Sequence, residues 1–138
     1  MSMDLQELRA INSSDAFNRW SGIEVASGDP GLAQLTLPWR PEFARASGHL
    51  HAGLIGALID TAASLAAWTL VGPVLASHCS IDWLRSVAAE RFTVKAMVVR
   101  AEGPAVVVAC DVFASSSEED EVHIATSEVT ATVVSETT

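Results

Sequence analysis

The sequence is poor in positive charge, and this shortage narrows the range of partners. Its 138 residues include 8 Lys and Arg against 17 Asp and Glu, which gives a formal net charge of -9. A charge of this sign disfavours nucleic acids and anionic membrane surfaces as partners. We therefore expect neither, and any anionic ligand must find a local group of arginines.

Cysteines and long apolar runs are also scarce. The two cysteines, Cys79 and Cys110, lie far apart without the spacing of a metal or redox site, so we expect two reduced thiols. The N-terminus lacks the basic and apolar regions of a signal peptide. The longest apolar stretch, residues 52–68, is interrupted by Asp60 and is short for a membrane span. These absences predict a soluble, cytoplasmic protein.

The length and composition fit one folded domain. A chain of this length can bury a sizeable core but leaves no room for a second one. Hydrophobic residues make up 49% of the sequence and charged residues 18%, as in globular proteins. We predict a single domain over residues 1–138 with an N-terminal helical segment at 1–20. So low a surface charge suggests that a second copy of the chain covers part of the surface.

The apolar pattern predicts an α+β fold around one long helix. From Ala52 to Trp68, apolar residues occupy most sides of a helical projection, which predicts a buried helix that Gly72 and Pro73 end. Period-two patterns predict strands on either side of this helix, with a bulge near 126–128 in the last strand. A curved antiparallel sheet that covers the helix accounts for this order. The predicted strands are 23–26, 32–37, 77–85, 90–101, 105–115 and 121–134.

Asp60 is the most unusual residue of this helix, because a carboxylate interrupts an otherwise apolar element. Burial of an unpaired charge is costly, so Asp60 must be paired, hydrogen-bonded, protonated or open to a cleft. Its helical face offers no Lys or Arg, which favours a ligand-binding face. A structural carboxylate bonded to backbone amides or Thr hydroxyls is the alternative. The residues that share its face are all small: Gly53, Gly56, Ala57 and Ser64.

The start of the same helix offers a second chemical feature. First-turn amides carry partial positive charge and stabilise a carbonyl oxygen that becomes an oxyanion. Ala52 and Gly53 have little side chain to obstruct such an oxygen. His51 could donate to it, although a lone histidine before a helix is more often a cap or a packed residue.

Two other kinds of site lack support in the sequence. A metal site built from His49, His51 and Asp60 has no further ligand at a recognisable spacing. A nucleophilic serine is also excluded, because no G-x-S-x-G motif occurs. We expect neither a metal nor a cofactor.

The helix segment GHLHAGLIGALIDTAASLAAW, residues 48–68, resembles a known family motif. It is similar to the N-x-x-G-x-x-H-G-G-x-x-x-x-L-x-D-x-A pattern of PaaI-type acyl-CoA thioesterases, which belong to the hotdog-fold superfamily. The resemblance extends from about residue 17 to 134 and includes WSGIEV and SIDWLRSV, the latter similar to the family's x-I-D-Y-L-R-P-A. It implies a hotdog fold, in which a curved antiparallel sheet wraps a long central helix.

The resemblance also implies roles for individual residues. In the family, the aspartate that matches Asp60 is the nucleophile or the base that activates water. The amide after the histidine, here that of Ala52, polarises the thioester carbonyl, and the histidine that matches His51 assists. Ala52 itself departs from the motif, since the family has glycine there, but it keeps the amide.

Two further departures concern polar groups of the family's site. The asparagine expected in the loop before the helix is replaced by Arg45 or Ala46, depending on the alignment. The Ser or Thr that holds the water in some members falls at Ala76, and Ser77 beside it points to the opposite face of a regular strand.

We therefore predict hydrolysis of an acyl-CoA thioester to a free acid and CoA. Asp60 attacks the carbonyl or deprotonates the attacking water, while the amides of Ala52 and Gly53 hold the oxyanion. The CoA phosphates need cations, and Arg85 and Arg91 are the best local supply. Substrate contacts are expected at Arg45, Thr61, Ser64, Ser77, Arg85 and Arg91.

Two alternative functions use the same fold. A non-catalytic acyl-CoA binding module keeps the pocket and loses turnover, which the replacements at Arg45 and Ala76 make plausible. A hotdog enoyl-CoA hydratase is less favoured, because Asp60 lies in the middle of a helix rather than in a loop motif.

Helix geometry predicts how the site is assembled. At a rise of about 1.5 Å per residue, Asp60 lies roughly 10 to 12 Å along the axis from Gly53 and Ala52. The carboxylate and the amide must both come within about 3 Å of one carbonyl group, which a single helix cannot readily achieve. Two antiparallel helices across a two-fold axis can. We expect an obligate homodimer, or a tetramer of two dimers, with Asp60 of one chain facing His51, Ala52 and Gly53 of the other.

Overall fold

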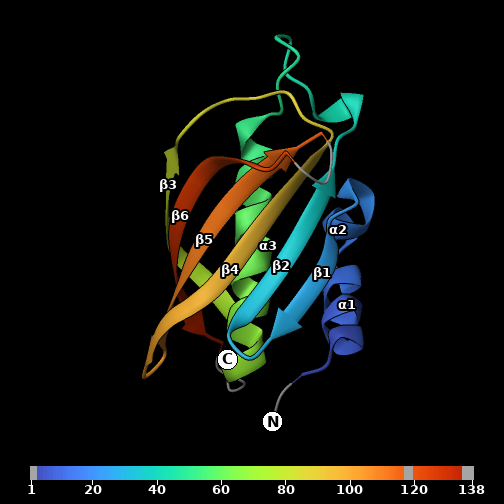
Figure 1. Cartoon of the computed structure of the whole chain (residues 1–138). Coiled ribbons are helices and arrows are strands. Elements are labelled where there is room, and N and C mark those ends of the chain that lie inside the picture. Colours follow the sequence, from blue (N-terminus) through green and yellow to red (C-terminus); the bar gives the residue numbers. More distant parts are fainter. Residues whose placement is uncertain (1–2, 117–119, 135–138) are drawn as a thin grey trace.

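The computed structural model describes residues 3–116 and 120–134. Within them, two short helices, α1 (Leu5–Ser14) and α2 (Ala16–Ser21), precede a long helix, α3 (Ala52–Val71) (Figure 1). A 3-10 turn, Pro41–Phe43, lies on the way into α3. The strands are β1 (Glu24–Asp29), β2 (Leu32–Pro38), β3 (Val74–Trp83), β4 (Arg91–Glu102), β5 (Ala105–Ser115) and β6 (Val122–Val133).

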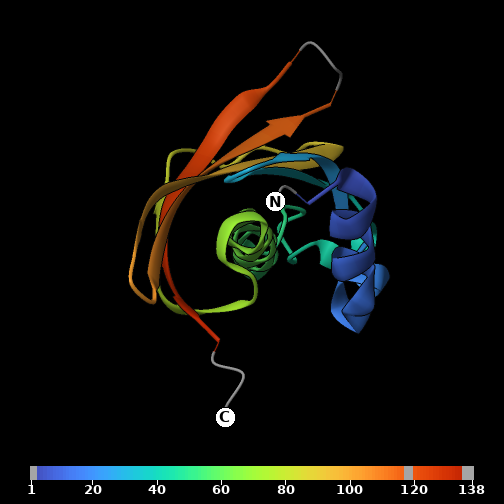
Figure 2. The ribbon, with the colours of Figure 1, turned by 90° about the horizontal axis from the view of Figure 1, so that it is seen from below.

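The strands form one antiparallel sheet in the order β1-β2-β4-β5-β6-β3. Seen along the axis of α3, the sheet curves around the helix, and α1 and α2 lie at the side of β1 (Figure 2). The predicted architecture, one long helix wrapped by a curved sheet, is therefore confirmed. The predicted turn between the two central strands is present too, with Gly103 in the left-handed region at φ 58°.

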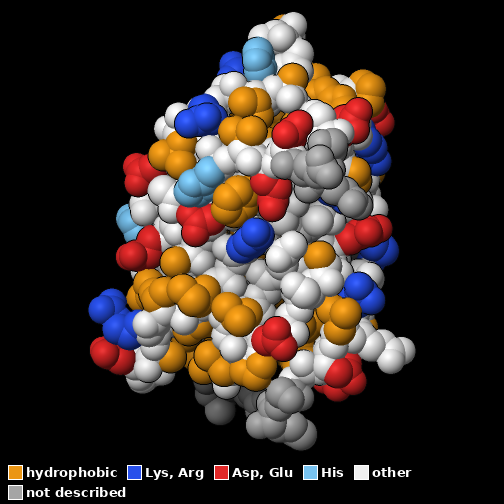
Figure 3. Space-filling model, viewed as in Figure 1, with side chains coloured by type: hydrophobic (Ala, Val, Ile, Leu, Met, Phe, Trp, Pro, Cys, Tyr) orange, Lys and Arg blue, Asp and Glu red, His pale blue; other side chains and the backbone are white. Residues whose placement is uncertain are grey.

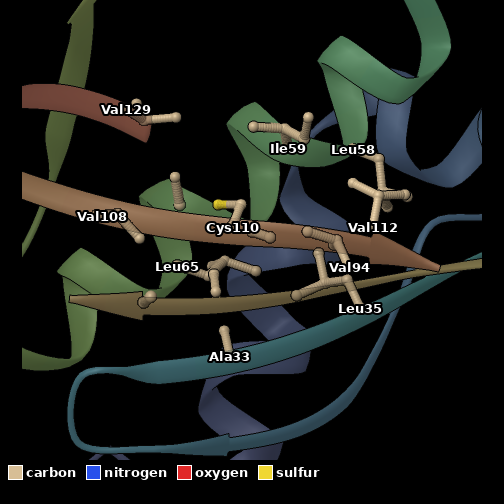
Figure 4. Close-up of a cluster of buried hydrophobic side chains, with 14 of the residues drawn as sticks. Ala33, Leu35, Leu58, Ile59, Leu65, Val94, Val108, Cys110, Val112 and Val129 are labelled. Atoms are coloured by element: carbon tan, nitrogen blue, oxygen red, sulfur yellow. The ribbon is translucent and has the colours of Figure 1, made fainter. Parts of the chain in front are cut away.

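The core lies between α3 and the concave face of the sheet (Figure 4). Alternate residues of β4 and β5 point into it, as their period-two pattern predicts. Burying one such aliphatic side chain contributes about 1.5 to 3 kcal/mol. The sheet residues that meet α3 include Phe92, Val94, Ala96, Val106, Val108, Cys110 and Val112, and the helix contributes Leu58, Ile59 and Leu65.

Helix α3 ends at Val71, three residues later than predicted. Gly72 is its C-cap, with φ 79°. By length and mean hydropathy, 1.7 over its best window, it passes for a membrane span, but 50% of that window is buried inside the fold. Packing against the sheet accounts for its apolar character. The apolar pattern predicted a helix that is buried on nearly all sides. This prediction is wrong, because one stripe of small residues faces away from the sheet.

The predicted bulge in the last strand is real but misplaced. Strand β6 shifts its register against β5 at Ile124, not at 126–128. Ile124 and Ala125 are both buried, and Ser127 and Val129 continue the new phase. Large apolar residues alone place the shift too late, because the small residues Ala125 and Ser127 carry the inward phase through the gap.

Strand β3 is the edge of the sheet and starts three residues earlier than predicted, at Val74. Most of its residues are exposed, and it pairs only with β6 in the described part of the chain. Its register against β6 shifts between Ala76 and His78, so the strand is not regular at Ser77. An open edge presents unpaired backbone groups that can pair with another strand.

Candidate functional site

The predicted face around Asp60 exists and is open. Asp60 and Gly53 are exposed, and Gly56, Ala57 and Ser64 are partly exposed. A side chain added at Gly56 would meet no atom within 4 Å, so nothing in the described chain packs on this part of α3. The face is available to a ligand or to a second copy of the protein.

The carboxylate of Asp60 has no hydrogen bond or salt bridge to any described residue. The neighbouring Thr61 hydroxyl donates to the Ala57 carbonyl at 2.8 Å rather than to Asp60. Partial burial and the negative charge of Asp15 raise the pKa of Asp60 above its ordinary value. The described residues therefore do not show the structural alternative, a carboxylate held by amides or Thr hydroxyls. A raised pKa makes the group a better general base.

The start of α3 corrects the predicted oxyanion site. His51 is the N-cap, and its Nδ1 accepts a hydrogen bond from the Gly53 amide at 3.0 Å. The Gly53 amide is thus occupied and does not hold an oxyanion in this conformation. The Ala52 amide donates to no described residue, so it is the one that remains available.

The cap also fixes the protonation pattern of the histidine. A neutral imidazole has one acceptor and one donor nitrogen. Because Nδ1 of His51 accepts, Nε2 carries the proton and can donate. His51 can therefore fill both roles considered for it, because Nδ1 caps the helix and Nε2 of the same ring can donate.

Ala52 lies on the wall of a cavity of about 450 Å³ between the start of α3 and the end of β3. Arg45 and Arg85 are on this wall, and Ile55 and Phe92 supply apolar surface. A second cavity, about 350 Å³, adjoins the first, since both are lined by Phe92 and the neighbouring Leu50 and Val87. The start of the helix thus opens onto one apolar groove with two arginines.

Asp60 lines a different and smaller recess, of about 100 Å³, between α3 and the N-terminal helices. Ala52 does not line this recess, and Asp60 does not line the groove. The structure brings Thr61 and Ser64 to the recess, as members of the predicted substrate-contacting set. Within one chain, Asp60 and Ala52, which has the free amide, therefore line two different cavities.

Two predicted substrate contacts lie elsewhere. Arg91 lines a shallow hollow with Thr93 and Glu121 and is not part of the groove that holds Arg85. The reason is the sheet: Arg91 begins β4, whereas Arg85 belongs to the segment after β3. Ser77 stands on the edge strand, and its hydroxyl donates to the Thr130 carbonyl at 3.1 Å.

The sequence reasoning missed the N-terminal side of the recess. Asn12, Asp15 and Asn18 line it together with Asp60. Asp15 is the N-cap residue of α2, but its side chain makes no cap hydrogen bond. The only signal in the sequence was that these polar residues lie in a short amphipathic segment. The packing of that segment against α3 is what brings them to the recess. No group of three potential metal ligands occurs in the part of the chain that the structure describes.

Known proteins share this fold. A thioesterase family protein of Silicibacter pomeroyi is 25% identical and superimposes with a TM-score of 0.86 over 92% of this chain and 95% of its own. The PaaI protein of the Escherichia coli phenylacetic acid degradation operon is 22% identical, with a TM-score of 0.82 over 96% of this chain and 97% of its own. These similarities confirm the hotdog fold.

Sequence comparison adds the family. A Saccharolobus solfataricus protein, named for a proposed esterase activity, is 28% identical over 100 residues, 71% of each chain. The thioesterase superfamily matches residues 47–121, more than half of the chain, a span that includes all of α3. With its hotdog fold, the chain belongs to the thioesterase superfamily, whose class of reaction is the hydrolysis of thioesters.

Proposed function

We propose that this protein hydrolyses acyl-CoA thioesters to a free acid and CoA, at a site shared by two copies of the chain. The observation that carries the proposal is the separation of two unused groups on α3. Ala52, whose amide donates to no described residue, lines the large groove, and Asp60 lines the small recess. The carboxylate can activate the nucleophile of a thioester hydrolysis, and the amide can stabilise the oxyanion.

The chemistry assigns each group a step. Asp60 takes a proton from a water molecule whose oxygen then bonds to the thioester carbon, or it attacks that carbon itself. The Ala52 amide, with Nε2 of His51 as a second proposed donor, stabilises the negative oxygen of the intermediate. The C–S bond then breaks, and the CoA thiolate leaves and takes up a proton. Where Asp60 itself attacked, a water molecule then hydrolyses the mixed anhydride, which releases the acid and restores the carboxylate. One such oxyanion donor is typically worth about 3 kcal/mol.

The groove suits CoA rather than a small ester. The chain is strongly acidic, so a ligand with several phosphates requires local cations. Arg45 and Arg85 are the cations of the groove, and its apolar wall suits the arm that carries the thioester. Arg91 is outside the groove, so it is not part of the proposed phosphate site.

Assembly as a homodimer completes the site. The open edge of β3 can pair with the same strand of a second copy, and the uncovered stripe of α3 leaves room for the partner's helix. Asp60 of one chain then stands beside Ala52 and His51 of the other. Figure 3 shows hydrophobic side chains gathered toward the lower end of the outer face of the sheet. Leu32 and Met97, cross-strand neighbours in β2 and β4, are exposed hydrophobic residues. This patch is a surface on which two dimers can pair into a tetramer.

A non-catalytic acyl-CoA binding module is the second candidate, and one observation favours it. Ala76 offers no hydroxyl, and the Ser77 hydroxyl already donates to the Thr130 carbonyl, so neither residue at the position that matches the family's Ser or Thr has a hydroxyl proton free for the attacking water. Substrate recognition would survive this loss.

Both candidates place the protein in the cytoplasm, a reducing compartment that suits the two free thiols.

The two candidates separate in one experiment. The purified protein is incubated with a panel of acyl-CoAs of different length and polarity, and free thiol is measured together with the mass of the protein in solution. Thiol release by a dimer or tetramer is expected. Binding of acyl-CoA without thiol release supports the binding module, and release by a monomer contradicts the shared site.

A further inference from the structure

The groove at the start of α3 consists of two connected cavities. Ala52 lines the first cavity only, whereas Leu50, Val87 and Phe92 line both. Leu50 precedes Ala52 by two residues, so the wall between the cavities lies close to the first turn of α3. A thioester held at the Ala52 amide is therefore near the entrance of the second cavity.

The second cavity, about 350 Å³, has a mostly apolar wall. One side of it is the segment 84–90, which crosses the end of the fold where α3 begins (Figure 1). Among the described residues, no lysine or arginine lines this cavity, and its charged residue is Glu90. Burial of an anion beside a carboxylate is costly, so the cavity favours a neutral, apolar group. Its wall residues that pack partly buried against the core are Trp39, Leu50, Val87 and Ala89.

The substrate of the proposed hydrolysis has two ends of opposite character. The phosphates of CoA need cations, and Arg45 and Arg85 line the first cavity but not the second. The recess beside Asp60, about 100 Å³, has roughly the space of three water molecules in the liquid, so a long acyl group does not fit into it. The second cavity is thus the apolar space that remains for the acyl end.

We propose that the substrate carries a neutral, apolar acyl group of medium length, which occupies the second cavity while the CoA phosphates bind Arg45 and Arg85. The inference rests on the proposed acyl-CoA hydrolysis and adds the substrate class to it. At roughly 30 Å³ for a group the size of a water molecule, the cavity has room for about ten such groups, which suits a chain of about six to ten carbons. Each methylene group that enters should raise kcat/KM by up to about fourfold.

The wild-type protein is tested with matched acyl-CoAs, and kcat/KM is measured by thiol release. Octanoyl-CoA should be hydrolysed at least about tenfold better than acetyl-CoA, because only the longer chain reaches the second cavity. Hexanoyl-CoA should be at least about tenfold better than adipoyl-CoA, which has the same length but ends in a carboxylate near Glu90.

Two variants change the size of the second cavity alone. Ala88 is exposed and lines only this cavity, so Ala88→Phe should lower kcat/KM for octanoyl-CoA at least about tenfold and leave acetyl-CoA nearly unchanged. Trp39→Ala enlarges the cavity and should move the best chain length upward. Ala101→Phe is the matched control, because Ala101 is exposed at the opposite end of β4 from Phe92, and it should keep the wild-type profile. Thermal unfolding confirms the fold of each variant.

The outcomes distinguish the inference from the function beneath it. Acetyl-CoA hydrolysed as well as octanoyl-CoA by the wild-type protein, or a chain-length profile that neither cavity variant changes, overturns the inference and leaves acyl-CoA hydrolysis standing. Absence of thiol release from every acyl-CoA contradicts the proposed hydrolysis instead. Calorimetric binding of acetyl-CoA and octanoyl-CoA then decides the inference, and equal affinities overturn it. If one cavity variant does not fold, the other decides.

Discussion

The first turn of α3 and its middle belong to one helix but present opposite electrostatics. The first turn has a free amide at Ala52 and opens onto a groove with Arg45 and Arg85. The middle has Asp60, which lines a recess together with Asn12, Asp15 and Asn18. The first turn suits negative charge that develops on an oxygen, and the middle suits the removal of a proton. Because the two regions serve different hollows, the proposed site brings them to one substrate with the help of a second chain.

The largest expected effect comes from removal of the charge in the middle of the helix. Asp60→Asn keeps the shape of the side chain and should lower kcat for the best acyl-CoA by at least about a hundredfold, a typical contribution of a general base. Thiol release gives the rate, and thermal unfolding confirms that the fold is intact. The wild-type rate in this variant would make Asp60 a structural residue.

Mixed dimers test the comparison between the two regions directly. One chain carries Asp60→Asn, and the other carries His51→Ala with Gly53→Leu, so each homodimer lacks one half of both sites. Random exchange should restore about a quarter of the wild-type sites, because half of the dimers are mixed and each has one complete site. Activity is measured before and after the chains are unfolded and refolded together. No recovery in a refolded mixture contradicts a site shared between chains.

The arginines of the groove should affect binding more than chemistry. Arg85→Ala should raise KM for acyl-CoA by about tenfold with little change in kcat, since the phosphates lie far from the reacting carbonyl. Arg91→Ala is the matched control, because Arg91 lies outside the groove, and its KM should stay at the wild-type value. Equal effects of the two substitutions would move the phosphate site.

The smallest expected effect concerns pH. Burial and the charge of Asp15 raise the pKa of Asp60, and hydrolysis needs the deprotonated carboxylate, so kcat/KM should fall as pH drops through this raised pKa. Asp15→Asn removes one of the two causes and should move the acidic limb of the profile to lower pH. The change is expected to be a few-fold in kcat/KM on that limb. An unchanged or oppositely shifted limb shows that Asp60 does not control it.

Stability provides an independent readout of the same pKa shift. A carboxyl with a raised pKa in the folded state destabilises the fold at every pH above that pKa and no longer does so at pH values below the unfolded-state value. Asp60→Asn should therefore raise the Tm slightly at neutral pH and leave it unchanged in acid. A lower Tm at neutral pH would show that the carboxylate has a stabilising partner.

The central part of the fold could be predicted from local pattern. Period-two alternation is clear in β4 and β5 because apolar residues occupy their inward positions, so both strands were placed to within one residue. The bulge in β6 was placed too late because Ala125 and Ser127 are too small to stand out as core residues. The start of β3 at Val74 was missed, since an exposed edge strand shows no alternation.

The sequence by itself determined the long central helix and the small-residue face around Asp60, since these depend on local spacing along the chain, and the resemblance of its helix motif implied the hotdog fold. It also determined that one helix could not hold both reacting groups, which follows from the rise per residue. Only the tertiary structure decided that the Gly53 amide is occupied by His51, that Arg91 lies apart from Arg85, and that N-terminal residues such as Asp15 line the same recess as Asp60. These contacts join atoms through side-chain rotamers or through segments distant in sequence, and local periodicity carries no information about either.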